Sequence, residues 1–142
     1  MKVLSIREPW ATLIINGYKD YEFRTWKTNY RGKILIHASL SMEKENKKRF
    51  QELNLKYNPG FIIGEAEIVD CIPVTKEFEN DLINRNELVY GATRNRNGYA
   101  WSLKNIKIYK NPIKAKGHLG LWNFSEIIWL NDRYRGKSEW MK

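Results

Sequence analysis

Lys19, Glu22 and Arg24 occupy one short stretch of the chain, and together they could bind or act on a charged ligand. Residues 20–26 alternate in character, which predicts a half-buried strand with Glu22 and Arg24 projecting from the same face. Lys19 comes immediately before that strand. A carboxylate between two cations stays ionised at neutral pH, and the group as a whole stays positive. The arrangement therefore suits a phosphate.

Three roles for this group are open at the level of the sequence. Arg24 could hold a phosphate through two parallel hydrogen bonds while Glu22 orients its guanidinium. Lys19, partly desolvated, could instead act as a general base, although a neighbouring carboxylate favours its charged form and opposes that role. The third interpretation is structural: an ion-pair network that ties the turn before the strand to the sheet.

Aromatic and polar neighbours extend the candidate site. Trp26 has the same parity as the two charged strand residues, so its ring is a candidate wall on which a base could stack. Trp10 has helical spacing to other apolar residues and is expected in the core. Thr28 and Arg31 lie in the loop after the strand and could reach the same cleft, although Arg31 could equally serve only the turn.

The elements that must position these residues can be predicted from local patterns. Pro9 fits the first turn of a helix and Gly17 its C-terminal cap. The strand that begins at Gly98 changes parity midway, which predicts a bulge near Lys104-Asn105. The expected strands are 2–6, 20–26, 33–38, 61–72, 98–109 and 119–124, and the expected helices lie near 9–16, 42–55 and 75–85. These elements predict an α+β domain, a small mixed β-barrel decorated by helices.

The charge of the chain favours a polyanionic partner. Lys and Arg number 25 against 16 acidic residues, giving a net charge of +9, and residues 88–125 contain no Asp or Glu at all. Lys and Arg residues are interleaved with aromatic residues through that segment. Surfaces of this kind bind phosphates through the cations and stack nucleobases on the rings. The alternative is a solvated basic face over a core of aromatic residues. The candidate contacts there are Arg94, Arg96, Trp101, Lys107, Lys114 and Lys116.

Several classes of protein are disfavoured by composition. The single cysteine, Cys71, cannot form an intramolecular disulfide, and the two histidines lie far apart, so neither a metal site nor a cofactor is expected. No apolar run approaches the roughly 20 residues of a membrane span, and the N-terminus lacks the apolar stretch of a signal peptide. We expect one domain over residues 1–142, located in the cytoplasm. The sequence indicates no oligomeric state.

The stretch Gly17–Arg24 resembles the signature of the ASCH (activating-signal-cointegrator homology) domain, Gly-x-Lys-x-x-Glu-x-Arg. Other stretches resemble the family in the same order: 5–11, 25–28, 31–34, 36–38, 63–66, 69–71, 99–101 and 116–122. The resemblance covers about residues 3–124 and leaves 125–142 as a C-terminal extension. It implies a PUA-like β-barrel, a fold otherwise found in proteins that bind or modify RNA.

The resemblance also implies two different functions. The chain is nearer to the cointegrator-type ASCH domain, for which the resemblance implies nucleic-acid binding, with RNA as the expected partner and DNA as a possible one. Some compact bacterial members are amidohydrolases that act on N4-acetylcytidine through a Lys, a Thr and a Glu, and ribonuclease activity has also been proposed in the family. Lys19 matches that lysine, but Glu22 stands where the threonine would be. The distant glutamate has only Glu77 and Glu79 as candidates.

We therefore expect a binding module first, and a small hydrolase using Lys19 and Glu22 as the alternative. An interaction module for a protein partner is a third interpretation, which no residue pattern favours.

Overall fold

The computed structural model describes residues 1–94 and 96–125, and the predicted C-terminal extension lies outside this range after Ser125. The chain forms an α+β fold, which confirms the predicted class. The strands are β1 (Lys2–Glu8), β2 (Tyr21–Arg24), β3 (Gly32–Met42), β4 (Phe61–Pro73), β5 (Tyr99–Lys114) and β6 (Leu121–Asn123). The helices are α1 (Trp10–Ile15), α2 (Lys44–Arg49), α3 (Lys76–Arg85) and α4 (Glu87–Tyr90), with a 3-10 turn η1 (Gln51–Leu53).

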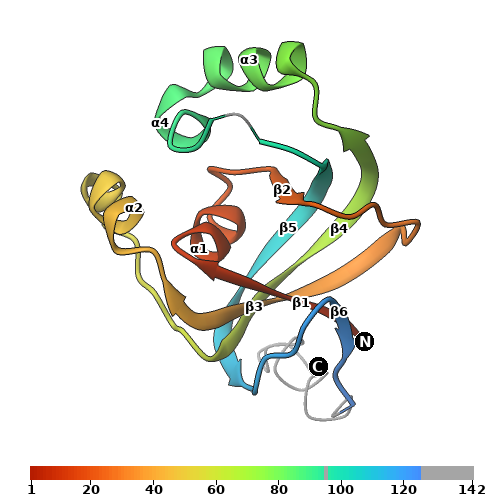
Figure 1. Ribbon diagram of the computed structural model, residues 1–142. Helices are drawn as coiled ribbons and strands as arrows, with labels where there is room; N and C mark the ends of the chain where they lie inside the picture. Colours follow the sequence, from red (N-terminus) through yellow and green to blue (C-terminus); the bar gives the residue numbers. More distant parts are fainter. Residues whose placement is uncertain (95, 126–142) are drawn as a thin grey trace.

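The strands form one mixed sheet in the order β2-β5-β4-β3-β1-β6. β1 and β3 are parallel, and all other neighbours are antiparallel. The sheet curls so that α1 lies within its curve, in contact with β1, β3, β4 and β5 (Figure 1). Closure of the sheet into a barrel, by pairing of β2 with β6, is not detected in the described part of the chain.

Two groups of buried side chains hold the helices on the sheet. Ile14 of α1 packs with Ile36 of β3 inside the curve. Leu13, the preceding residue, packs instead with Phe50 and with Tyr90 of α4, in a cluster that also contains residues of α3. α1 therefore lies between two apolar clusters, which fixes the position of the residues at both of its ends.

α1 begins and ends as its sequence predicts. Pro9 offers no side-chain cap, but the buried carboxylate of Glu8 accepts hydrogen bonds from the Thr12 backbone N–H at 2.9 Å and the Thr12 hydroxyl at 2.6 Å. Gly17 adopts a φ of 83°, a left-handed conformation that costs glycine little. The turn that follows brings Lys19 back towards the start of the helix, where its ammonium lies 5.8 Å from the centre of the Trp10 ring.

Several predicted elements differ in extent from those observed, and one observed helix was not predicted. The helix expected over 42–55 is short, because β3 continues to Met42, which pairs with Glu8 at the end of β1. The last predicted strand is limited to β6, and α4 was not predicted at all. β5 extends past its predicted end at residue 109, because Ile113 and Lys114 pair with β4 again after an irregularity.

The predicted bulge in β5 is confirmed. Lys107 pairs with Glu65 and Lys104 with Glu67, so β5 has one more residue than β4 between these pairs. Asn105, within the extra segment, has a φ of 53°. This conformation changes the parity of the strand, as the sequence pattern indicates.

Candidate functional site

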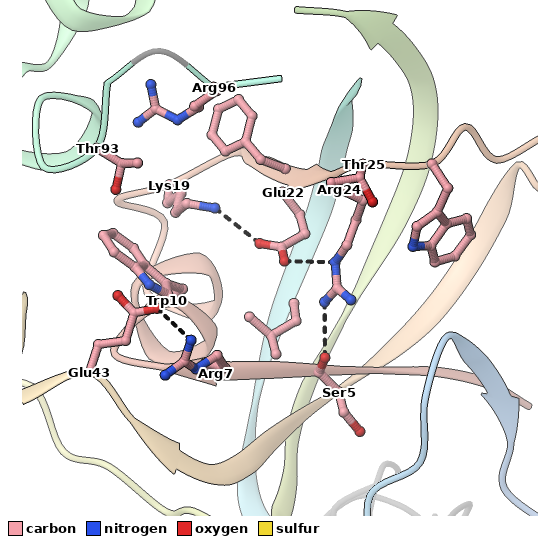
Figure 2. Close-up of a pocket in the computed structure, with 13 residues that line it drawn as sticks. Ser5, Arg7, Trp10, Lys19, Glu22, Arg24, Thr25, Glu43, Thr93 and Arg96 are labelled. Carbon is pink, nitrogen blue, oxygen red and sulfur yellow. Dashed lines mark hydrogen bonds and ion pairs between the residues drawn. The ribbon is translucent and has the colours of Figure 1, made fainter. Parts of the chain in front are cut away.

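A pocket of about 470 Å³ opens between β1, α1, β2 and the segment before β5 (Figure 2). Its volume is within the range of small-molecule sites. Among residues 1–94 and 96–125, four basic side chains line it against two acidic ones, an excess of positive charge. The lining residues are Ser5, Ile6, Arg7, Trp10, Lys19, Glu22, Phe23, Arg24, Thr25, Trp26, Glu43, Thr93 and Arg96.

The central feature of the pocket is an ion-pair network on β2. Glu22 Oε1 lies 3.1 Å from Lys19 Nζ, and Glu22 Oε2 lies 3.0 Å from Arg24 Nε. Glu22 and Arg24 are therefore on one face of the strand, as the alternation over 20–26 predicts. Because Glu22 uses both oxygens in these contacts, it holds the two cations at a fixed separation (Figure 2).

Lys19 is almost fully buried beneath the pocket. Its ammonium donates hydrogen bonds to Glu22 and to the Tyr21 carbonyl, and it lies 5.2 Å from the centre of the Phe23 ring. Burial lowers the pKa of Lys19 from its usual value, and the attraction of Glu22 opposes this shift. The attraction expected from the sequence is therefore present, but desolvation is the larger of the two effects on this pKa.

Arg24 connects two strands that do not pair in the sheet. Its Nε is held by Glu22, and its Nη2 donates to the Ser5 carbonyl on β1 at 2.9 Å. Its remaining nitrogen, Nη1, makes no hydrogen bond or ion pair within residues 1–94 and 96–125. The guanidinium is thereby fixed in one orientation with a donor left for a ligand.

The profile of the ASCH domain matches residues 4–116, which include the whole network on β2. The chain belongs to the ASCH domain family. Human activating signal cointegrator 1 is 29% identical over 83 residues, a match that covers 49% of this chain and 14% of the human protein. Mouse activating signal cointegrator 1 is 24% identical over 141 residues, covering 88% of this chain and 22% of the mouse protein. The chain thus spans less than a quarter of either relative.

Solved structures share the ASCH fold. An ASCH protein from Zymomonas mobilis superposes with a TM-score of 0.57 at 17% identity, over 90% of both chains. A mutant form of the same protein gives a TM-score of 0.55 at 18% identity, over 91% of this chain and 94% of that one. At this level of identity the likeness is one of fold.

The tryptophans of the ASCH pocket differ in part from their expected roles. Trp26 lines the pocket with 40% of its surface exposed, and its ring lies nearly perpendicular to that of Trp101, with the centroids 4.7 Å apart. Trp101 itself is fully buried, so the expectation that it contacts a nucleic acid is wrong. Trp10, expected in the core, is only half-buried and forms a second aromatic wall of the pocket.

The segment before β5 contributes a wall that sequence reasoning only partly anticipated. Arg96, expected on a basic surface, has its guanidinium 2.8 Å from Glu79 and 4.4 Å from the centre of the Phe23 ring. Burial lowers the pKa of Arg96, and Glu79 opposes the shift. Thr93 was missed, and so was the pair formed by Arg7 and Glu43 at 3.3 Å on the opposite side.

Two residues expected near the cleft do not line it. Thr28 is buried, and its hydroxyl accepts a hydrogen bond from the Tyr30 N–H. Arg31 donates hydrogen bonds to the carbonyls of Thr28 and Tyr30. It therefore stabilises the loop, which is the second of the two roles expected for it from the sequence.

The remaining basic candidates lie outside the pocket. Arg94 is exposed, with its guanidinium 3.8 Å from Glu87. Lys107 and Lys114 are exposed on β5, and Lys116 is exposed in the segment after it. The part of these residues in ligand binding stays a prediction.

Residues 1–94 and 96–125 contain neither a metal-binding cluster nor a membrane-spanning helix. No group of three or more His, Cys, Asp or Glu side chains is placed to hold a metal ion in that part of the chain. No helix there is long and apolar enough to cross a membrane.

Proposed function

We propose that this ASCH domain binds RNA and takes one unpaired nucleotide into the pocket on β2. The observation that carries the proposal is the fixed guanidinium of Arg24, which keeps a free donor beside exposed aromatic rings. A cation held in one orientation loses little freedom when a phosphate binds. The ion-pair network on β2 thus holds the Arg24 guanidinium in position to contact a phosphate.

The rings on either side of the network support a base as the rest of the ligand. Trp10 and Trp26 both line the pocket, and Trp26 is substantially exposed. Proteins that recognise single-stranded RNA bind its unstacked bases by stacking them on aromatic side chains of this kind. A base paired within a duplex has no free face to offer, so we expect the bound nucleotide to be unpaired.

The direct experiment measures binding of a fluorescently labelled single-stranded RNA by anisotropy, with DNA of the same sequence as the second ligand. Arg24→Gln should weaken RNA binding by about tenfold, the loss expected for a hydrogen bond to a charged group. Arg85→Gln is the matched control, because Arg85 forms an exposed pair with Asp20 outside the pocket. Absence of RNA binding by the wild-type protein would refute the proposal, and tighter binding of DNA would reassign the ligand.

A small hydrolase is the second candidate, favoured by the lowered pKa of Lys19. A neutral lysine beside a carboxylate can accept a proton during hydrolysis. Thr25 and Thr93 supply hydroxyls to the same pocket, although neither occupies the position of Glu22. Of the glutamates expected from the resemblance, Glu79 is engaged by Arg96.

The test of this second candidate is incubation with N4-acetylcytidine and with a labelled RNA. Turnover of either substrate that disappears in Lys19→Ala, with the fold retained, would favour a hydrolase. RNA binding without turnover would favour the binding module.

A further inference from the structure

A second cavity, of about 340 Å³, adjoins the opposite end of α1 from the first pocket. Trp10, the first residue of the helix, lines the first pocket, and Ile15, the last, lines the second. The turn after the helix is divided in the same way, because Tyr18 lines the second cavity and Lys19 the first. A six-residue helix is roughly 9 Å long. The two cavities are therefore close neighbours.

An irregularity of β5 forms one side of the second cavity. Gly64 of β4 pairs with Ile108, and the next pair along is Ile62 with Ile113. β4 has a single residue between these pairs, whereas β5 has the four residues 109–112. The surplus backbone cannot follow β4 and must arch away from it. This arch, with the segment after η1, borders the hollow.

The chemistry of the second cavity suits a nucleotide. Lys56 and Lys110 line it, and no Asp or Glu does so within residues 1–94 and 96–125. Tyr18 is 41% exposed and Ile108 is 58% exposed, so a ring and an apolar side chain are left open to a ligand. Asn58 adds a side-chain amide, which can pair with the edge of a base. Cations beside an exposed ring and an amide match the phosphate and base of one nucleotide.

We propose that this cavity is a second nucleotide subsite, which holds another nucleotide of the RNA strand seated in the first pocket. The proposal rests on the proposed function, since the same strand must occupy both sites. Tyr18 stacks on the base, and Lys56 and Lys110 contact the phosphates on either side of it. Ile108 and Lys110, two residues apart on β5 after the bulge at Asn105, are both exposed and both line this cavity.

The test is an anisotropy titration with a labelled single-stranded RNA of about ten nucleotides, a length within the usual site size of such proteins. Tyr18→Ala should weaken binding by about fivefold or more, as expected for the loss of one stacked base. Tyr18→Phe, which keeps the ring, should bind like the wild type. Lys110→Gln should lower the slope of log affinity against log salt by about 0.7. The matched control is Lys44→Gln, since Lys44 is exposed on α2 and lines neither cavity.

The outcomes separate this proposal from the proposed function. If Tyr18→Ala and Lys110→Gln bind like the wild type while Arg24→Gln is weakened, the second subsite is refuted and the first pocket stands. Equal losses in Tyr18→Phe and Tyr18→Ala would also refute the stacking role. If the wild-type protein binds no RNA, both proposals fail together.

Discussion

The Ser5 carbonyl oxygen accepts a hydrogen bond of 2.9 Å from Arg24 Nη2 and so links β1 to β2, two strands that do not pair with one another. Glu22 holds the same guanidinium from the other side. Arg24 therefore contributes to the structure of the pocket and also presents a donor within it. Substitutions in the ion-pair network should separate its contribution to the stability of the domain from its contribution to ligand binding.

Replacing Glu22 should destabilise the domain strongly. In Glu22→Gln the buried ammonium of Lys19 loses its charged partner, and breaking a buried ion pair costs about 3–5 kcal/mol. Denaturant unfolding measures the change. Glu87→Gln is the control, because Glu87 is exposed and its pairs with Arg49 and Arg94 should contribute less than about 1 kcal/mol. Equal stability of the two variants would contradict the importance of the network.

Trp26 should contribute to binding more than to stability. Its ring is partly exposed and packs at nearly a right angle to the ring of Trp101. Trp26→Ala should weaken RNA binding by about fivefold or more, whereas Trp26→Phe should keep most of the affinity because a ring remains. Anisotropy measures the affinity, and thermal unfolding checks the fold. Unchanged binding in Trp26→Ala would remove this ring from the site.

The stability of the domain should depend on the protonation of His37. Its Nε2 lies 2.7 Å from the Ala115 carbonyl and must carry the hydrogen, so Nδ1 accepts from the Ser5 hydroxyl at 2.9 Å. Burial lowers the pKa of His37, although the bond to Ala115 opposes the shift. The folded state then binds fewer protons than the unfolded state, and stability falls as the pH drops below the unfolded pKa of about 6.5.

The measurement is urea unfolding of the wild type and of His37→Gln at several pH values. The advantage of the wild type should shrink as the pH falls from neutral to acidic. A second comparison is His118→Gln, which removes an exposed side chain whose charge helps to lower the pKa of His37, and which should therefore keep the pH dependence in a weaker form. A difference between wild type and His37→Gln that stays constant with pH would contradict the assignment of a neutral, buried imidazole.

The exposed lysines of β5 should act on RNA through phosphates. Lys107→Glu and Lys114→Glu should each weaken binding to a similar degree for RNAs of different sequence, because phosphates carry no sequence information. Affinities for several unrelated RNAs provide the test. A loss confined to one sequence would instead indicate a contact with a base.

The sequence was sufficient to predict those features of the fold that depend on residues close together in the chain. The alternation over 20–26 was sufficient to place Glu22 and Arg24 on one face, and Pro9 and Gly17 marked the ends of α1 closely. The parity change near Asn105 predicted a real bulge. These features depend on backbone geometry over a few residues, which a single sequence records directly.

Features set by distant contacts could not be predicted in this way. Parity gave Trp101 a face of β5 but could not reveal that this face packs into the main core cluster, where the ring is fully buried. The wall of the pocket built by Arg96 depends on a partner in α3, Glu79. The helix expected over 42–55 was shortened by pairing of β3 with β1. Each of these outcomes depends on tertiary packing, which overrides local propensity.

The most direct test of the central claim is the salt dependence of RNA binding by the wild type and by Arg24→Gln. If Arg24 contacts a phosphate, log affinity should fall linearly with log salt concentration, and Arg24→Gln should lower the slope by about 0.7 along with the affinity. An affinity that does not change with salt would contradict the claim. So would a slope in Arg24→Gln equal to that of the wild type, because the guanidinium held by Glu22 and Ser5 would then meet no phosphate.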